Sequence, residues 1–411
     1  MTEGTIPTLQ EFEEAAAGLA SVIEHTPMEH TQFLSDLLGS PVRLKLENLQ
    51  RTGSFKVRGA THFINRLSES DRARGVVAAS AGNHAQGVAL AAQMLGIPAT
   101  IYMPLGVPVP KLLSTRGYGA EVVLDGATVE VGLRRAAEHA ERTGAVLVPP
   151  FDHRDIIVGQ GTVGLEIVDD VPDVDTIVVG IGGGGLIAGV AAAAKARAAQ
   201  KGRTVRIIGV QAENAAPYPL SLEAGHPVAV TTKPTIADGI HVARPGDVPF
   251  EIIRELVDEV VTVTDDDIAR GMLVLLERAK IVAEPAGAVG VAAIMAGKIN
   301  ASGMTVPVIS GGNIDPLLLQ RVVAHGLAAS GRYMSILIPL PDRPGQLAQI
   351  SAILAEVGAN VIEVLHTRHG QGMQIGEVTI QISVETRGEE HRQLTLECLR
   401  EAGFRPEIVP E

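Results

Sequence analysis

Residues 75–103 read GVVAASAGNHAQGVALAAQMLGIPATIYM. Within this stretch, residues 75–80 have the pattern of a buried strand, residues 83–95 that of an Ala-rich helix, and residues 99–103 that of a second strand. Two strands joined through a helix by short turns are typical of a parallel βαβ unit. The stretch therefore predicts an α/β fold.

The same layout recurs further along the chain. Residues 176–179 and 205–210 have strand patterns, and residues 186–199 between them have a helical pattern that follows four consecutive glycines. Parallel strands place the turns that follow them at one edge of the sheet, where ligands bind in open α/β folds. The glycine-containing turns therefore mark the predicted site.

Composition excludes several classes of protein. The chain has 411 residues, of which 46% are hydrophobic, which indicates two or three domains with ordinary cores. A net charge of -13 without a dense Lys/Arg run argues against nucleic-acid binding. The lone Cys398 excludes an internal disulfide and is predicted to be a small core residue of a helix.

The sequence gives no sign of export or of membrane insertion. The first ten residues lack the charged and apolar regions of a signal peptide. The most apolar stretch, residues 176–194, is interrupted by six glycines. We therefore expect a cytoplasmic protein without a transmembrane helix.

The pattern changes after residue 326, and we predict a boundary near Ser330 between domains over residues 1–329 and 330–411. A strand starts near Tyr333, and Asp342 is predicted to cap a helix that has Pro344 in its first turn and ends at Gly358. Strands at residues 361–365 and 378–384, a helix at residues 389–402 and a strand at residues 407–409 follow. The order βαββαβ is that of a ferredoxin-like domain.

A lysine in residues 52–59, TGSFKVRG, has two interpretations. Lys56 is one of eight lysines and stands at the start of an apolar helix. Its stem could pack while the ammonium reaches water. Alternatively it is a Schiff-base lysine, whose charged form is disfavoured by burial and by the adjacent Arg58, so that it acts as a nucleophile and a proton acceptor. The motif by itself leaves both open.

Residues 80–87, SAGNHAQG, crowd polar and small side chains into a strand-to-helix turn. Such a turn presents backbone N–H groups at a helix N-terminus, and Ser80 and Asn83 add side-chain hydrogen bonds. A bound carboxylate fits this arrangement. An ordinary capped turn is the alternative, although it explains the whole polar cluster less well.

The four glycines at residues 182–185 also have two interpretations. Consecutive backbone amides at a helix N-terminus suit a phosphate. From Gly180 onward the run also satisfies G-x-G-x-x-G, and Glu213 ends the following strand, so a nicotinamide-dependent oxidoreductase is the alternative. Glu213, however, follows Gly185 by 28 residues, more than the roughly 20 usual for the ribose-binding acid.

Two further turns carry polar groups. Residues 306–309 form a predicted strand that leads into Ser310-Gly311-Gly312-Asn313, and residues 283–287, AEPAG, form a turn with a lone acid, Glu284. The 12 histidines show no spacing typical of a zinc or iron site, so no catalytic transition metal is predicted.

Five motifs in order, LENLQRTGSFKVRGA, AASAGNHAQG, GGGGL, EPAG and SGGN, resemble those of fold-type II pyridoxal-phosphate enzymes and, among them, the threonine dehydratases (threonine ammonia-lyases). The resemblance extends over about residues 8–326. It implies a tryptophan synthase β-like catalytic domain with two lobes built on parallel sheets, the smaller over roughly residues 45–155. It also implies pyridoxal 5'-phosphate as the cofactor.

By motif position, the resemblance implies a role for each residue of the site. Lys56 is the catalytic residue and holds the cofactor, Phe55 packs near its ring, Asn83 bonds its 3-oxygen, and Ser310 faces its pyridine nitrogen. The residues implied to bind the 5'-phosphate are Gly182, Gly183, Gly184, Gly185 and Leu186. Those implied to bind the substrate carboxylate are Ser80, Ala81, Gly82 and His84.

The implied reaction is β-elimination of water from L-threonine, giving 2-oxobutanoate and ammonia, with L-serine to pyruvate as a second activity. A neutral serine at the pyridine nitrogen favours elimination over transamination. Related serine racemases carry a serine where this chain has Ala81, which favours a dehydratase. Some relatives bind a divalent cation through an acid like Glu213 and a second acid, which is missing here, so no metal site is predicted.

The C-terminal domain, with Asp342, Arg343, Pro344 and Gly345 after its first strand, resembles an ACT regulatory domain. It is predicted either to bind an amino-acid or nucleotide effector at those residues and give allosteric control, or to be a dimerisation or packing module without a ligand. A non-enzymatic amino-acid sensor built on this domain is a further alternative. The family suggests a homotetramer, and a role in isoleucine biosynthesis is expected.

Overall fold

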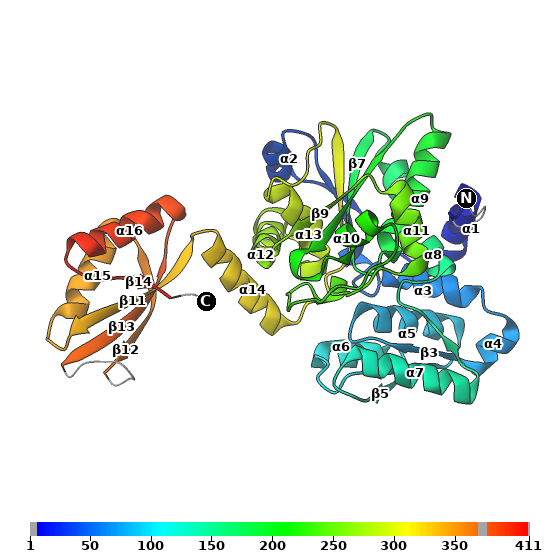
Figure 1. Cartoon of the computed structure of the whole chain (residues 1–411), viewed down its shortest axis with the longest axis horizontal. Helices are drawn as coiled ribbons and strands as arrows, with labels where there is room; N and C mark the ends of the chain where they lie inside the picture. Colours follow the sequence, from blue (N-terminus) through cyan, green and yellow to red (C-terminus); the bar gives the residue numbers. More distant parts are fainter. Residues whose placement is uncertain (1–5, 369–375, 410–411) are drawn as a thin grey trace. The chain divides into compact units, whose positions relative to one another are not determined.

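The computed structural model describes residues 6–368 and 376–409, and Figure 1 shows them in two compact units. The first unit extends over Met1–Pro316 and the second over Leu317–Glu411. Helix α14 (Pro316–Ala329) occupies the interval between this division and the predicted boundary after residue 329. The domain limits 1–329 and 330–411 stay a prediction.

The first unit contains two sheets, of which the larger has the order β1-β2-β10-β7-β8-β9. Every neighbouring pair in it is parallel except β1 with β2. Its strands are β1 (Met28–His30), β2 (Arg43–Leu46), β7 (Val174–Gly180), β8 (Arg206–Ala212), β9 (Glu259–Val263) and β10 (Met304–Ile309). The helical segments around it are α1 (Leu9–Leu19), α2 (Gln32–Leu38), η1 (Glu47–Leu49), α8 (Arg154–Asp170), α9 (Gly185–Gln200), η2 (Glu213–Ala215), α10 (Pro217–Ala224), η3 (Asp238–Ile240), α11 (Asp247–Leu256), α12 (Asp265–Val274), η4 (Leu275–Ala279) and α13 (Pro285–Met295).

The smaller sheet has the order β5-β4-β3-β6 and is parallel throughout. It is built from β3 (Val76–Ala79), β4 (Ala99–Met103), β5 (Glu121–Leu124) and β6 (Val146–Leu147). The helices of this lobe are α3 (Lys56–Asn65), α4 (Glu69–Arg74), α5 (Asn83–Leu95), α6 (Val109–Gly117) and α7 (Val129–Thr143). The predicted two-lobed α/β architecture with parallel sheets is confirmed, and the smaller lobe lies below the larger one in Figure 1.

Glycines bring the helices at the centre of this unit into close contact. A Cβ on Gly164 of α8 would stand 2.7 Å from the carbonyl oxygen of Val190 in α9, and one on Gly159 would stand 2.7 Å from that of Arg58 in α3. Real Cβ atoms do not approach so closely, so only glycine permits these backbone contacts. Helix α3, which begins at Lys56, is thereby held directly against α8.

Three of the parallel strands end at the turns that the sequence predicts to form the site. β3 leads into the turn before α5, β7 into the glycine run before α9, and β10 into Ser310. The predictions of a helix over residues 83–95 and a strand over residues 99–103 match α5 and β4 residue for residue. Both glycine-containing turns therefore lie where the sequence places them.

The second unit has the predicted βαββαβ order. Its elements are β11 (Tyr333–Pro341), α15 (Gln346–Val357), β12 (Asn360–Thr367), β13 (Glu377–Glu385), α16 (Glu389–Glu401) and β14 (Glu407–Ile408), and they follow α14. The sheet order is β12-β13-β11-β14, with antiparallel neighbours. Alternate residues of β11 and β13, such as Ile336 and Ile380, are buried in a core of their own. Cys398 lies in α16 as predicted, but it is only half-buried.

One prediction for this unit is wrong. Asp342 does not cap the helix: α15 begins at Gln346, and its N-cap is Gly345 with φ +92°, which offers no side-chain hydrogen bond. Residues 342–345 instead form a turn in which Arg343 N donates to Pro341 O over 2.8 Å. The end at Gly358, in the left-handed region at φ +77°, is confirmed.

Within residues 6–368 and 376–409, none of the helices combines the length and the apolar character needed to cross a bilayer. Residues 1–5, which form half of the stretch used for the signal-peptide prediction, lie outside the described residues.

Candidate active site

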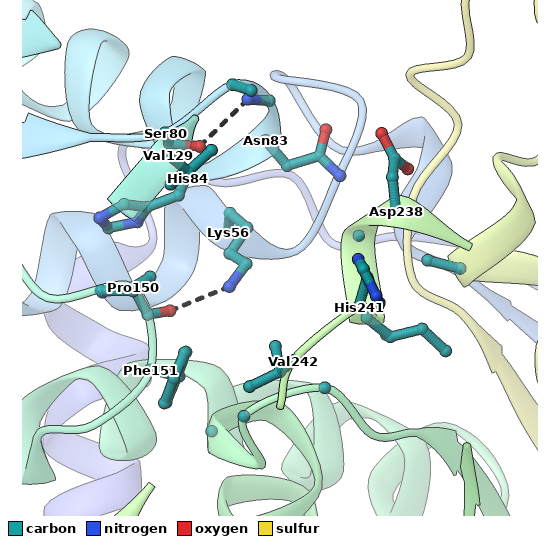
Figure 2. A pocket seen from close by; sticks show the side chains of 18 of the residues that line it. Lys56, Ser80, Asn83, His84, Val129, Pro150, Phe151, Asp238, His241 and Val242 are labelled. Carbon is teal, nitrogen blue, oxygen red and sulfur yellow. Dashed lines mark hydrogen bonds between the residues drawn. The ribbon is translucent and has the colours of Figure 1, made fainter. Parts of the chain in front are cut away.

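A cavity of about 530 Å³ lies between the two lobes of the first unit, and Figure 2 shows some of the side chains that line it. We call it the Lys56 cavity. It brings together all the residues predicted for the cofactor and for the substrate carboxylate: Phe55, Lys56, Ser80, Ala81, Gly82, Asn83, His84, Gly182, Gly183, Gly184, Gly185, Leu186 and Ser310. These residues come from four separate segments of the chain.

Lys56 is the first residue of α3, and its ammonium is inside the cavity. Its Nζ donates to the carbonyl oxygen of Pro150 over 2.9 Å and lies 5.2 Å from the centre of the Phe55 ring. Burial lowers the pKa of Lys56 to about 8, although the Glu284 carboxylate opposes the shift. A buried lysine whose pKa is this low is a nucleophile and a proton acceptor near neutral pH. The hydrogen bond of Nζ to Pro150 favours the Schiff-base interpretation over that of a lysine that reaches bulk water.

The predicted contribution of Arg58 to this pKa is wrong. Arg58 is fully buried, but its guanidinium turns away from Lys56 and binds Glu47 and Glu166. Residues two apart on a helix do not face each other. The low pKa of Lys56 therefore has burial as its cause, and not the neighbouring cation.

The turn before α5 offers backbone donors. Gly82 is the N-cap of α5, and its N–H donates to Ser80 Oγ over 3.1 Å. His84 Nε2 lies 3.0 Å from the carbonyl oxygen of Val148. Because that oxygen only accepts, Nε2 carries the proton and Nδ1 is bare.

His84 is also held neutral. Burial and the charge of Lys56 lower the pKa of His84 to about 3. Its ring therefore neither carries positive charge nor has a free N–H for a carboxylate. A carboxylate at this turn is left with backbone N–H groups and the Ser80 hydroxyl as donors.

The glycine run before α9 has no space for side chains. A Cβ on Gly185 would stand 3.0 Å from the backbone oxygen of Phe151, and one on Gly182 would stand 3.1 Å from Cα of Ile240. Gly184 is the N-cap of the 16-residue α9 and has φ +101°, which favours glycine. The first N–H groups of a helix have no partner within it, so this loop presents several donors and the positive end of the helix dipole to an anion.

Sequence reasoning missed several of the charged residues that line the cavity. Glu284, for which the sequence indicates no role, accepts through Oε1 from Asn83 Nδ2 over 2.6 Å. Burial, together with the charge of Asp238, raises the pKa of Glu284 to about 7. Lys111 of the small lobe pairs with Asp238 of the large lobe over 3.2 Å. The scarcity of lysine, which drew attention to Lys56, was also a signal for Lys111.

Within the described part of the chain, no group of three His, Cys, Asp or Glu residues is arranged to hold a metal ion. Glu213 is the first residue of η2 and is not among the residues that line the Lys56 cavity.

Comparison with known proteins places this site in a family. Residues 19–311 match the family model described as "Pyridoxal-phosphate dependent enzyme", and residues 334–404 match that of the ACT domain. The chain belongs to the pyridoxal-phosphate dependent enzymes. The nicotinamide-dependent alternative, built on the same glycines, therefore does not apply.

Three similar proteins cover most of the chain. An L-threonine ammonia-lyase of Thermotoga maritima is 48% identical over 403 residues, which are 98% of this chain and 99% of that protein. The structure of maize serine racemase has a TM-score of 0.73 at 35% identity and covers 79% of this chain and 98% of its own. Threonine deaminase isoform 2 from Solanum lycopersicum has a TM-score of 0.72 at 38% identity and covers 77% of this chain and 87% of its own.

The Lys56 cavity fits the cofactor of the pyridoxal-phosphate dependent enzymes. Its lysine carries a lowered pKa, as an amine that reacts with an aldehyde requires. Its glycine run leaves backbone donors and a helix N-terminus open to a phosphate, where any side chain would fill the space. The role of each site residue stays a prediction.

The residues predicted for regulation lie in the turn between β11 and α15. Asp342 N donates to Gly376 O over 2.9 Å, and the Asp342 carboxylate lies 3.5 Å from the guanidinium of Arg368. Arg343, Pro344 and Gly345 complete this exposed turn. Their binding of an effector stays a prediction.

Proposed function

We propose that this protein catalyses the deamination of L-threonine to 2-oxobutanoate and ammonia, and of L-serine to pyruvate. The observation that carries the proposal is the convergence of every residue predicted for cofactor and substrate on one cavity around Lys56. The names of the bacterial and tomato relatives, a threonine ammonia-lyase and a threonine deaminase, support this substrate.

Lys56 has two tasks in the proposed reaction. Bound pyridoxal phosphate withdraws electrons from the substrate's Cα and thereby makes the Cα proton acidic. Lys56 Nζ would hold the cofactor through its aldehyde group, and the same amine would accept the proton from the substrate's Cα. A pKa of about 8 leaves enough neutral amine near neutral pH for both tasks.

Two helix N-termini bind the two anions. The N–H groups at the start of α9, with the glycine run, bind the cofactor phosphate, and those at the start of α5, with Ser80, bind the substrate carboxylate. Fixing both groups sets the position of Cα relative to Lys56 Nζ. Such positioning supplies a large part of the acceleration in reactions of this kind.

Ser310 and Ala81 bear on the type of reaction. The Ser310 hydroxyl, at the end of β10, brings no negative charge to the pyridine nitrogen, which favours expulsion of the β-hydroxyl over transamination. Ala81 brings no hydroxyl to the face of the substrate opposite Lys56, so it cannot return a proton there. We therefore propose elimination rather than racemisation, despite the similarity to maize serine racemase.

The first test is the visible absorption of the purified protein before and after L-threonine is added, with release of 2-oxo acid followed in parallel. We expect a cofactor band that shifts with substrate while 2-oxobutanoate appears. Chiral analysis of the serine reaction should show pyruvate with little D-serine. A protein that stays colourless and inactive with added pyridoxal phosphate would refute the proposal, and D-serine as the main product would replace it with racemisation.

Replacement of Lys56 tests the central residue. Lys56→Ala should lower turnover of L-threonine by more than about 10³-fold, because both binding of the cofactor and proton removal depend on this amine. Lys201→Ala is the control, since Lys201 lies at the surface, paired with Asp169 over 2.7 Å. A Lys56→Ala variant with the wild-type rate contradicts the assignment.

We further propose that the C-terminal ACT domain controls the activity by binding a small-molecule effector at residues 342–345, and that the protein is a cytoplasmic homotetramer. The match over residues 334–404 supports a regulatory domain. Titration of isoleucine against the initial rate tests a feedback role in isoleucine biosynthesis, and an unchanged rate favours a packing module instead. Sedimentation of the purified protein tests the tetramer.

A further inference from the structure

Three side chains from distant parts of the chain form a line of hydrogen bonds at the edge of the Lys56 cavity. Asn83 is the first residue of α5, Glu284 is the N-cap of α13, and Asn313 follows β10. Asn313 Nδ2 donates to Asn83 Oδ1 over 2.9 Å, and Asn83 Nδ2 donates to Glu284 Oε1 over 2.6 Å. We call these three residues the Asn83 relay.

A backbone carbonyl fixes the direction of the relay. Asn313 Nδ2 also donates to the carbonyl oxygen of Thr52 over 2.6 Å. Because this oxygen only accepts, the end of the Asn313 amide that faces it must be the nitrogen. The Asn83 atom that meets the same nitrogen must then accept, so it is Oδ1, and Asn83 Nδ2 is turned toward Glu284.

Two glycines make room for the relay. Gly53 has φ +70°, and a Cβ there would overlap the side-chain amide of Asn313. A Cβ on Gly311 would overlap Glu284 Oε1 and stand 3.2 Å from Asn83 Nδ2. The relay is thus enclosed by backbone on both sides, and its side chains have little freedom to turn.

The relay leaves one N–H of Asn83 without a partner inside the relay, so that it can face a ligand. Its Oδ1 is engaged by Asn313 and one N–H of Nδ2 by Glu284, while no acceptor among the described residues takes the second N–H. Asn83 lines the Lys56 cavity, so this side chain has an N–H donor to offer a ligand there. A donor in this place suits an oxygen with negative charge.

We infer that Glu284 and Asn313 are positioning residues, which hold the Asn83 amide in the one orientation that offers an N–H to the cofactor's 3-oxygen. The inference rests on the proposed function, because Asn83 is the residue predicted to bind that oxygen. Glu284 accepts from Asn83 whether or not its carboxyl is protonated, since one carboxyl oxygen remains an acceptor in both states.

The test measures cofactor affinity and not only activity. Cofactor-free protein is titrated with pyridoxal phosphate, and the visible band of the loaded protein is recorded. Asn83→Ala, Glu284→Leu and Asn313→Ala should each weaken the affinity about tenfold and shift the band, as the loss of one buried hydrogen bond requires. Glu284→Gln, which keeps an oxygen acceptor, should stay within about threefold of the wild type.

Combined variants separate positioning from a general structural role. In the Asn83→Ala background, adding Glu284→Leu or Asn313→Ala should bring no further loss of affinity, because their effect passes through Asn83. Asn214→Ala is the matched control, as Asn214 Nδ2 donates to Pro234 O over 2.9 Å at the surface. Thermal unfolding of each variant confirms that it is folded.

The outcomes keep the two proposals apart. Losses that add in the double variants, or single variants with unchanged affinity and band, overturn the inference while the wild type still binds cofactor and deaminates threonine. A wild type that binds no pyridoxal phosphate overturns the proposed function itself.

Discussion

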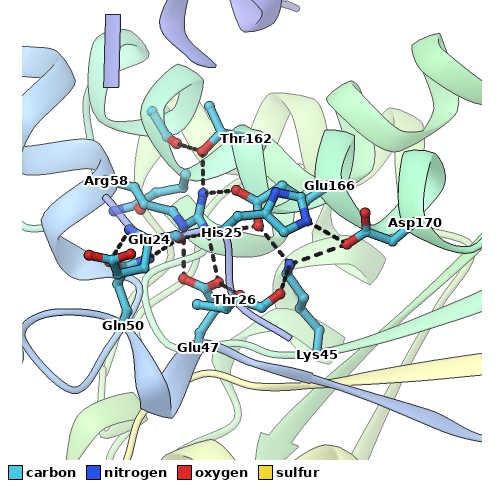
Figure 3. A network of polar contacts seen from close by, with 12 residues as sticks. Glu24, His25, Thr26, Lys45, Glu47, Gln50, Arg58, Thr162, Glu166 and Asp170 are labelled. Atoms are coloured by element: carbon cyan, nitrogen blue, oxygen red, sulfur yellow. Dashed lines mark hydrogen bonds and ion pairs between the residues drawn. The ribbon is translucent and has the colours of Figure 1, made fainter. Parts of the chain in front are cut away.

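Lys56 and Arg58 are cations two residues apart on α3, one half-buried in the cavity and the other fully buried, and their surroundings are opposite. Arg58 donates through Nε and Nη2 to both oxygens of Glu47 over 2.8 Å, and through Nη1 to Glu166 over 2.6 Å and to Thr162 Oγ1 over 3.0 Å. Figure 3 shows this cluster, which Lys45 joins through Glu166 over 2.6 Å. We call it the Arg58 network. Lys56, in contrast, has one neutral carbonyl as its partner.

The comparison separates burial from pairing. Burial opposes the charge on both side chains, but Glu47 and Glu166 outweigh it and raise the pKa of Arg58 above its ordinary value. No carboxylate bonds to Lys56, so burial lowers its pKa to about 8. Pairing therefore decides which cation holds the fold together and which can react.

Breaking the ion pair between Arg58 and Glu47 should have the largest effect on stability. Glu47→Gln removes one of the two carboxylates that pair with the buried Arg58 and leaves Glu166, and we expect it to lower the free energy of unfolding by about 3 to 5 kcal/mol in urea titrations. Glu251→Gln is the control, because Glu251 and Arg254 form a pair at the surface, and it should cost less than about 1 kcal/mol. Equal losses in the two variants would mean that the network contributes no more than a surface pair.

Removing the charge of Lys56 should raise the free energy of unfolding rather than lower it. Lys56→Met in the cofactor-free protein should raise the free energy of unfolding at pH 7 by up to about 3 kcal/mol, since the ammonium no longer has to be desolvated. The folded pKa of about 8 lies below the ordinary 10.5, so the unfolded wild type binds more protons between these values. The free energy of unfolding of the wild type therefore rises between pH 8 and pH 10.5. At pH 10.5 the variant should no longer be more stable than the wild type.

Urea titrations at pH 7, 9 and 10.5 check this dependence. Lys201→Met, which removes a lysine at the surface, is the matched control. Its free energy of unfolding should equal that of the wild type at all three pH values. An advantage of Lys56→Met that persists unchanged at pH 10.5 would show that the gain comes from packing and not from the charge.

Lys111 is an intermediate case that sharpens the comparison. It is mostly buried and pairs over 3.2 Å with Asp238, whose side chain is 58% exposed. Its Nζ lies 3.5 Å from the position that a Cβ on Gly82 would occupy, beside the turn predicted to bind the carboxylate. We expect Lys111→Met to raise KM for L-threonine about tenfold with a smaller effect on kcat, through the loss of a charge-assisted contact.

The matched change Asp238→Asn keeps Lys111 in place and frees it from its partner. It should not raise KM, and it should alter the free energy of unfolding by less than about 1 kcal/mol, because the Asp238 side chain is 58% exposed. Steady-state kinetics of the two variants test whether Lys111 contributes to the binding of L-threonine. An unchanged KM in Lys111→Met would limit Lys111 to a link between the lobes.

The sequence predicted the elements that depend on local pattern. Apolar periodicity and turn residues defined α5 and β4 to the residue, and the motifs led to the residues that meet in the Lys56 cavity. The contact between Asn83 and Glu284 was beyond such reasoning, because it joins side chains 201 residues apart. The contact between Arg58 and Glu166 of α8, 108 residues apart, was hidden for the same reason.

Other errors had local causes. Arg58 was expected to act on Lys56, although a helix directs residues two apart to different sides. Asp342 was expected to cap a helix, but Gly345, at φ +92°, delays its start to Gln346. Both mistakes came from reading neighbours in sequence as neighbours in space.

The Arg58 network also affects how the stability of α3 depends on temperature. The hydration of charged groups becomes less favourable as temperature rises, so the cost of keeping Arg58, Glu47 and Lys45 out of water falls on warming. Stabilisation by apolar burial levels off over the same range. The end of α3 that presents Lys56 is therefore fastened by the kind of interaction that weakens least on heating, and it should be among the last parts of the first unit to loosen.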